Sequence, residues 1–248
     1  MNNLPLEKVT SYVEENISGF HAKRAEALVA LKLPRILKRK NPYLFRAKNL
    51  LTAQDLVKSI LDAHLSSQEE TLFGDFLEQL AIYICGLVYG GTKSAAEGID
   101  LEFARDGKKY IVSIKSGPHW GNSQQIARMK DNFRRAKRVL RTSGHGAEVV
   151  AVNGCCYGRD DRFHKEEYLK LCGQRFWEFI SGNPSLYVDI VEPLGHRAKE
   201  KNEDFMERYA QILNRFTLEF TTEFCTPSGQ IDWARLVAFN SEGKEAAA

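Results

Sequence analysis

The sequence predicts an α/β protein in which helices cover a mixed β-sheet. A β-hairpin pattern occupies residues 98–117, a continuous apolar run at residues 148–153 predicts a central strand, and helical periodicity precedes and follows both. The 248 residues are enough for one good core with a smaller appendage. A hydrophobic content of 43% and a charged content of 27% are typical of soluble globular proteins.

The hairpin reads GIDLEFARDGKKYIVSIKSG. Asp106-Gly107 suits a two-residue turn with positive backbone angles. Counting outward from this turn places Asp100 opposite Ser113, with Lys115 two residues further along the same face. Alternation along the two strands predicts a buried face made of Ile99, Leu101, Phe103, Tyr110, Val112 and Ile114.

The other face of the hairpin would carry Asp100, Glu102, Ser113 and Lys115. A carboxylate there can bind a hard cation such as Mg2+, and a neighbouring lysine can orient a water that attacks phosphorus. The alternative is an ordinary Asp–Lys ion pair on a solvated surface, which is common and weak. The hairpin alone leaves both interpretations open.

Helices are predicted on the N-terminal side of the hairpin. Residues 5–31 suggest helices broken near Gly19, and Leu33-Pro34 interrupts them. A helix from residue 52 to 65 would be followed, after Ser66-Ser67, by a second helix from 68 to 89.

Helices alternate with strands after the hairpin. The N-cap of the next helix would be Asn122 or Ser123, because these residues precede its apolar stripe. The predicted elements are a helix at 124–141, a turn at 143–146, a strand at 148–153, a helix at 164–181, a strand at 186–191 and a mostly helical segment at 195–224.

Two basic segments are candidates for DNA contacts. Residues 32–48 hold seven cations, and helix 124–141 holds seven cations against Asp131 alone. Each could be a solvated face, but each could also neutralise phosphates. The candidate DNA-binding residues are Lys38, Arg39, Lys40, Arg128, Arg134, Arg135 and Arg159, with Asn122, Ser123 and Gln124 as amide or hydroxyl groups that could read base edges.

Three features indicate a cytoplasmic protein that does not enter a membrane. Five cysteines without a framework spacing make disulfides improbable. The N-terminal residues MNNLPLEKV do not resemble a signal peptide, and the longest apolar run, at residues 80–89, is too short to span a bilayer.

Gly98-Ile99-Asp100 followed by Ser113-Ile114-Lys115 resembles the PD-(D/E)XK nuclease signature. More closely, residues 41–240 resemble a family of type II restriction endonucleases. The segments that carry this resemblance are NPYLFRAKN, SSQEETLFGDFLEQLA, GGTKSAAEGIDLEF, VSIKSGPHWGNS, VNGCCYG, CGQRFWEFISG and IDWARLVAFNS. The chain departs from the general signature at Ile99, where proline is usual, and at Ser113, where a second acid is usual.

The resemblance implies a restriction-endonuclease-like fold and a metal site on the hairpin. Asp100 would bind Mg2+, the carbonyl of Ile114 could add a ligand, and Lys115 would orient or help deprotonate the attacking water. Ser113 would hold a water or a metal ligand in place. The missing acid would come from elsewhere in the chain. Glu78 is the first choice, and the others are Glu102, Glu97 and Asp131.

The predicted function is Mg2+-dependent, sequence-specific cleavage of double-stranded DNA by a homodimer, leaving 5′-phosphate and 3′-hydroxyl ends. Residues 1–65 would form a helical arm for dimerisation or DNA wrapping, residues 66–240 the catalytic domain, and residues 241–248 a disordered tail. The alternatives are a repair or structure-specific nuclease of the same fold, a catalytically weakened DNA-binding protein, and an interaction domain for an acidic protein.

Overall fold

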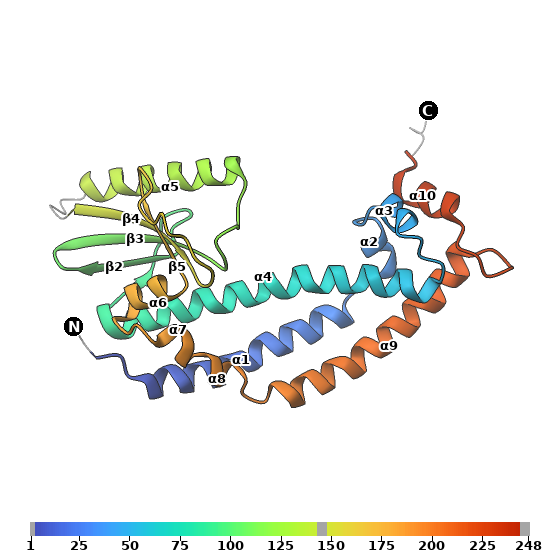
Figure 1. Cartoon of the computed structure of the whole chain (residues 1–248), viewed down its shortest axis with the longest axis horizontal. Helices are drawn as coiled ribbons and strands as arrows, with labels where there is room; N and C mark the ends of the chain where they lie inside the picture. The colour runs from blue at the N-terminus through green and yellow to red at the C-terminus, as the bar shows by residue number, and fades with distance from the viewer. Residues whose placement is uncertain (1–2, 143–147, 244–248) are drawn as a thin grey trace. The chain divides into compact units, whose positions relative to one another are not determined.

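A five-stranded mixed sheet carries the hairpin. The computed structural model describes residues 3–142 and 148–243, and Figure 1 shows the order of its elements. The strands β1 (Thr92–Lys93), β2 (Leu101–Arg105), β3 (Lys108–Lys115), β4 (Glu148–Cys155) and β5 (Leu169–Cys172) follow one another across the sheet. The first three strands pair antiparallel, whereas β3, β4 and β5 pair parallel. The predicted α/β class and mixed sheet are therefore confirmed.

The chain forms two compact units, each assembled from two separate segments. The sheet unit contains the residues up to Gly19 and residues 73–196, and the helical unit contains residues 20–72 and those from Arg197 onward. These boundaries differ from a division at residue 65, because α1 (Leu6–Val29) and α4 (Ala53–Tyr89) each contribute to both units.

The hairpin has the predicted turn and register. Asp106 and Gly107 have φ angles of 53° and 73°, which a two-residue type I′ turn requires. Arg105 pairs with Lys108 directly beside this turn. The same register continues to Leu101 and Val112, so Asp100 lies opposite Ser113 as predicted.

Helix α5 (Ser123–Thr142) covers one face of the sheet (Figure 1). Met129 and Phe133 of this helix form a buried cluster with Ile111 of β3. Ile99 belongs to the same cluster, so its assignment to the Leu101 face was wrong: it precedes β2 and is not bound by the alternation of that strand. The face that carries Asp100 is consequently covered near Ile111 and open only at its end.

Aromatic rings fill the opposite face of the sheet. Phe103 stacks on Tyr89 of α4 and on Tyr110 of β3, with ring centroids 5.5 and 5.1 Å apart. Phe179 of α6 (Gln174–Ser181) packs edge-on against Phe103 and Tyr110. These contacts hold the hairpin between α5 on one side and α4 and α6 on the other.

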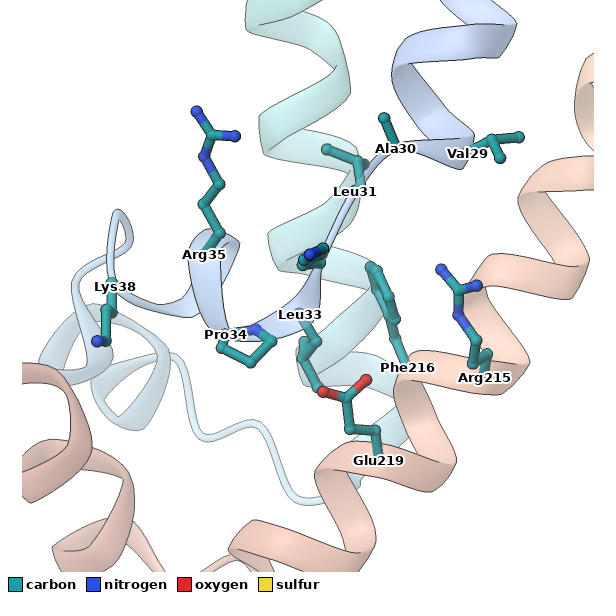
Figure 2. A pocket seen from close by; sticks show the side chains of 11 residues that line it. Val29, Ala30, Leu31, Leu33, Pro34, Arg35, Lys38, Arg215, Phe216 and Glu219 are labelled. Atoms are coloured by element: carbon teal, nitrogen blue, oxygen red, sulfur yellow. The ribbon is translucent and has the colours of Figure 1, made fainter.

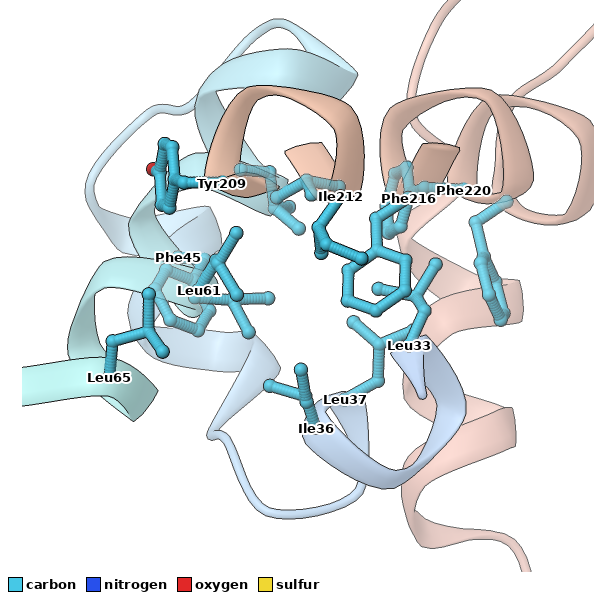
Figure 3. Packing of buried hydrophobic residues seen from close by; sticks show 14 of the residues in the cluster. Leu33, Ile36, Leu37, Phe45, Leu61, Leu65, Tyr209, Ile212, Phe216 and Phe220 are labelled. Atoms are coloured by element: carbon cyan, nitrogen blue, oxygen red, sulfur yellow. The ribbon is translucent and has the colours of Figure 1, made fainter. Parts of the chain in front are cut away.

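The helical unit has its own apolar core (Figure 3). The short helices α2 (Leu33–Leu37) and α3 (Pro42–Ala47) pack with the first half of α4, with α9 (Ala198–Phe224) and with α10 (Trp233–Ser241). Leu33 and Ile36 of α2 and Phe216 of α9 are each at most 1% exposed.

Two predicted helix breaks are absent, and those predictions were wrong. Helix α4 runs unbroken through Ser66-Ser67, where the Ser67 hydroxyl donates to the carbonyl of Ala63 one turn earlier, at 3.1 Å, instead of capping a new helix. Helix α1 continues through Gly19, where a single glycine costs about 1 kcal/mol but does not end a helix. By length and composition α4 could cross a membrane, a test that the core helix of a soluble protein also passes; its residues Leu80 and Ile84 are fully buried in the fold.

Three further predictions were wrong in element type. The segment predicted as a helix at 164–181 is β5 followed by α6, separated by Gly173 with φ 54°. The strand predicted at 186–191 is instead the short helices α7 (Leu186–Asp189) and α8 (Val191–Leu194), whose backbone bonds are local. The loop predicted at 92–98 begins with β1. The predicted turn at 143–146 and most of the predicted tail lie outside the described residues.

Candidate active site

Asp100 and Lys115 meet at the open end of the hairpin. The Asp100 carboxylate accepts a hydrogen bond from the backbone N–H of Ile114 at 2.6 Å. The ammonium nitrogen of Lys115 lies 3.8 Å from the same carboxylate oxygen and donates to the Ile114 carbonyl at 2.8 Å. Their side chains are 20% and 31% exposed, so both groups face solvent on one side of the sheet.

Glu78 of α4 brings a second carboxylate to this site. Burial raises the pKa of Glu78, and the negative charge of Asp100 raises it further, while the ammonium groups of Lys93 and Lys115 oppose the rise. Lys93 lies closest, with its nitrogen 3.5 Å from the Glu78 carboxylate. The charges of Asp100 and Lys115 therefore both act on the Glu78 carboxylate.

Glu102 is engaged elsewhere. It accepts a hydrogen bond from the Ser94 hydroxyl, and the Lys109 ammonium lies 3.0 Å from its carboxylate. Burial opposes the charged form of Glu102, but these two donors outweigh it and hold the pKa below its ordinary value. Glu102 shares a strand face with Asp100 but already has two partners of its own.

The other two acids considered from the sequence are also occupied. Glu97 pairs with Arg128 and Arg135 at 3.0 and 3.7 Å. Asp131 pairs with Arg134 at 2.8 Å. Glu78 is thus the acid that the structure places in the electrostatic field of Asp100 and Lys115.

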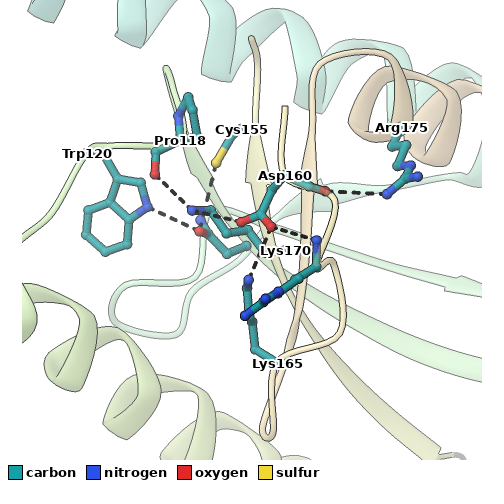
Figure 4. A network of polar contacts seen from close by, with 9 residues as sticks. Pro118, Trp120, Cys155, Asp160, Lys165, Lys170 and Arg175 are labelled. Carbon is teal, nitrogen blue, oxygen red and sulfur yellow. Dashed lines mark hydrogen bonds and ion pairs between the residues drawn. The ribbon is translucent and has the colours of Figure 1, made fainter. Parts of the chain in front are cut away.

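Ser113 is buried beneath the site and is only 2% exposed. Its carbonyl accepts a hydrogen bond from the side-chain amide of Asn153 at 3.2 Å. The amide oxygen of Asn153 in turn accepts from the indole N–H of Trp120 at 3.1 Å, the contact drawn in Figure 4. The Trp120 ring centre lies 5.4 Å from the Lys115 ammonium.

Asn153 and Trp120 were not among the predicted site residues. Asn153 is a polar residue at the end of an apolar strand and is 1% exposed, which was the available signal in the sequence. Its partners lie 33 and 40 residues away along the chain, so sequence spacing could not identify them.

A second polar network ties together the loops that follow β3 and β4 (Figure 4). Asp160 pairs with Lys165 and Lys170 at 3.2 and 3.3 Å, and Lys170 also donates to the carbonyl of Pro118 at 2.9 Å. Burial disfavours the charged carboxylate, but the hydrogen bonds from the two lysines hold the pKa of Asp160 below its ordinary value. The network fixes the loop that follows β3 after Lys115.

The positive charge of α5 is partly neutralised by acids that lie outside the helix. Arg134 makes two hydrogen bonds to Glu167, at 2.6 and 2.7 Å, and Lys130 lies 3.5 Å from the same residue. Glu167 and Glu97 lie outside the helix, so these cations have more acidic partners than the count within the helix includes. A charge count along one helix omits acids that neighbouring segments bring to it.

The remaining candidate DNA-binding residues are divided between the two units. Asn122 caps α5, since its side chain accepts from the Gln125 N–H at 3.0 Å while Gln125 accepts from the Asn122 N–H at 2.9 Å. Ser123 and Gln124 are exposed in the first turn, and Arg159 is exposed in the loop after β4. Lys38, Arg39 and Lys40 belong to the helical unit.

The site suits a hard divalent cation. Among the described residues no group of three or more His, Cys, Asp or Glu side chains forms a ready-made metal site. The oxygen donors are the carboxylates of Asp100 and Glu78 and the carbonyl of Ile114. The two carboxylates repel each other, which a bound cation would relieve. Mg2+ often takes one or two carboxylates and completes its shell with water, so this donor set fits it.

Two comparisons with known proteins bear on this geometry. No curated protein matches the chain. A family model described as type II restriction endonuclease EcoO109I matches residues 7–202, which is most of the chain. Enzymes of this family cleave DNA, and PD-(D/E)XK is their usual superfamily. The chain therefore belongs to the family of the type II restriction endonuclease EcoO109I.

Proposed function

We propose that the protein hydrolyses phosphodiester bonds in duplex DNA at a specific short sequence, with Mg2+ bound at Asp100 and Glu78. The observation that carries this proposal is the meeting of Asp100, Lys115 and the charge of Glu78 at one partly exposed end of the hairpin. The family membership supplies the substrate, DNA.

Each residue at the site has a separate role in this proposal. Asp100 and Glu78 would hold the metal together with the Ile114 carbonyl, and the metal would supply charge neutralisation at the phosphate and a more acidic bound water. Lys115 is held by the Ile114 carbonyl beside Asp100, from where its ammonium would orient the attacking water and stabilise the negative charge on the phosphoryl oxygens. Ser113 is buried, so we assign it to the support of the Asp100 and Lys115 backbone rather than to metal binding.

We further propose a homodimer in the cytoplasm that leaves 5′-phosphate and 3′-hydroxyl ends. A two-fold dimer presents one active site to each strand of a symmetric sequence. All five cysteines are free thiols, as is usual in a reducing compartment. Sedimentation of the protein with and without duplex DNA tests the dimer.

Digestion of a DNA of known sequence, followed by mapping and chemical analysis of the ends, tests the reaction. We expect discrete fragments with 5′-phosphates in the presence of Mg2+. Lys115→Ala should bind the same DNA but not cut it, whereas Lys108→Ala, at a partly exposed position near the other end of the same strand, should cut normally. Undiminished cleavage by Lys115→Ala would remove the lysine from the mechanism.

The absence of an acid at position 113 favours one second candidate, a DNA-binding protein with little catalytic activity. This candidate predicts sequence-specific binding without cleavage in both Mg2+ and Mn2+. The same digestion separates the two candidates, because cleavage in either metal excludes the second.

A further inference from the structure

The helical unit contains a cationic cavity far along the sequence from Asp100 and Lys115. It has a volume of about 420 Å3 and lies between the end of α1, helix α2 and the first half of α4. Its apolar lining consists of Ala27, Ala30, Leu31 and Ile36, and its polar lining consists of Lys32, Arg35, Arg39, His64, Ser67 and Gln68.

The positive charge of this cavity has no acidic counterpart. Residues 32–48 contain seven cations and no acid, and none of the three cations that line the cavity forms an ion pair with a described residue. Glu69 forms an ion pair with Arg24. Asp62 forms an ion pair with Lys58 and accepts a hydrogen bond from the Tyr209 hydroxyl. The cations that pair on α5 differ in this respect, since acids from other segments neutralise them.

A neighbouring pocket lies between α2 and α9, and Figure 2 shows how the Arg35 side chain is oriented there. It contains the acid Glu219 and the cation Arg215, and it shares Lys32 and Arg35 with the first cavity. Arg35 points away from Glu219 in Figure 2, so the single acid of the pocket does not neutralise it.

The pKa of His64 reflects the positive potential inside the cavity. Burial lowers the pKa of His64, and the charges of Lys40, Arg39 and Arg35 lower it further. Among the described residues, no acid opposes this lowering of the His64 pKa. The imidazole is therefore held neutral at pH 7, beside cations whose charge is not satisfied within the protein.

The cationic and polar side chains that line the cavity are suited to binding a phosphate group. Arginine guanidinium groups match the oxygens of a phosphate in a bidentate manner, and a lysine adds a point charge. The Gln68 amide can donate a further hydrogen bond, and the Ser67 hydroxyl, which donates to the Ala63 carbonyl in the structure, can do so after rotation about its side-chain bond. The cavity is too cationic for an apolar ligand, whereas a phosphate group offers charged oxygen acceptors to these donors.

We propose that this cavity is a phosphate-binding site in which Lys32, Arg35 and Arg39 hold the phosphate oxygens and His64, Ser67 and Gln68 complete the shell. The phosphate group can belong to the backbone of bound DNA or to a free phosphate. The site does not depend on the proposed cleavage reaction, because none of its residues belongs to the unit that carries Asp100 and Lys115.

Histidine NMR tests the proposal directly. The chain contains six histidines, and the His64→Gln variant identifies the His64 signal by its loss. The pKa of His64 is measured with inorganic phosphate and with sodium chloride at matched ionic strength. We expect phosphate to raise this pKa saturably, by about 0.5 or more, since a bound anion offsets the nearby cations.

Two double variants of equal charge provide the contrast. Arg35→Gln with Arg39→Gln should weaken phosphate binding at least about tenfold, because two charge-assisted contacts are lost. Lys23→Gln with Lys48→Gln removes two cations of the same unit that do not line the cavity and should leave the binding unchanged. Thermal unfolding of both variants checks that they are folded.

Duplex DNA distinguishes the two sources of phosphate. The Lys115→Ala variant is titrated with duplex in EDTA, so that no strand is cut. A shift of His64 at much lower concentration than with inorganic phosphate assigns the site to the DNA backbone, and a shift with phosphate alone assigns it to a free phosphate. If neither ligand moves His64 beyond the chloride control, or if the Arg35 and Arg39 double variant shows the same shift as the wild type, the site does not exist. Cleavage by the wild type is measured separately, so loss of activity and loss of this site are distinguishable.

Discussion

The ring centre of Trp120 lies 5.4 Å from the ammonium of Lys115, on a loop that follows the same strand. The Trp120 indole is itself held by Asn153, which is buried and also bonds to the carbonyl of Ser113. Such a cation–π contact contributes about 0.5 to 2 kcal/mol. Lys115 is thus held by an aromatic face in addition to the Ile114 carbonyl and the Asp100 carboxylate.

Replacing Trp120 should therefore slow cleavage without preventing DNA binding. We expect Trp120→Leu to lower the single-turnover rate about tenfold, which corresponds to about 1.4 kcal/mol, because the lysine loses one of its three restraints. Trp120→Phe keeps an aromatic ring but loses the hydrogen bond to Asn153, so its single-turnover rate should lie between those of the wild type and Trp120→Leu. Equal rates for all three proteins, at equal DNA affinity, would show that the ring does not position Lys115.

The same substitution at two acids near the hairpin should affect cleavage very differently. Glu78→Gln should reduce cleavage by at least about 100-fold, or about 2.7 kcal/mol, because a proposed metal ligand is lost. Glu102→Gln should cut at a rate close to that of the wild type, since this carboxylate is paired with Ser94 and Lys109. Rates measured over a range of Mg2+ concentrations test both, and the reverse ranking would make Glu102 the ligand.

The parts of the fold that local chemistry determines were predictable from the sequence. The turn at Asp106-Gly107 sets the hairpin register, so the meeting of Asp100 and Lys115 followed from counting residues. The segment at 169–172 was misassigned because its strand character depends on parallel pairing with β4, which local periodicity does not encode.

In the candidate site, too, residues close in the sequence were predictable and residues brought together by packing were not. Lys115 and Asp100 are joined by a short turn, whereas Trp120 and Asn153 meet through tertiary packing alone. Glu78 became a candidate through the family resemblance and its position in an apolar run, and packing of α4 against the sheet was needed to place its charge near Asp100.

The Asp160 network predicts a specific dependence of stability on pH. The pKa of Asp160 is lower in the folded protein than its ordinary value of 3.8, so its contribution to stability is fully present above that pH. The contribution is lost as the pH falls below 3.8 through the lower folded value. Asp160→Asn should therefore lower the free energy of unfolding by about 1 kcal/mol at pH 7, discounted for partial exposure, and by less at lower pH. Urea unfolding of both proteins between pH 7 and pH 3 measures the difference, and a constant difference over that range would contradict the prediction.

The core of the helical unit offers a matched pair of positions on one helix. Phe216 of α9 is 1% exposed and packs in the cluster of Figure 3, whereas Leu218 on the same helix is 70% exposed. Phe216→Ala should lower the free energy of unfolding by about 3 to 5 kcal/mol, because it removes buried apolar surface and leaves a cavity. Leu218→Ala should change it by no more than about 0.5 kcal/mol. Urea unfolding followed by tryptophan fluorescence and by circular dichroism gives both values. Similar losses for the two variants would mean that the exposed face of α9 is covered in solution, for instance by a second copy of the chain.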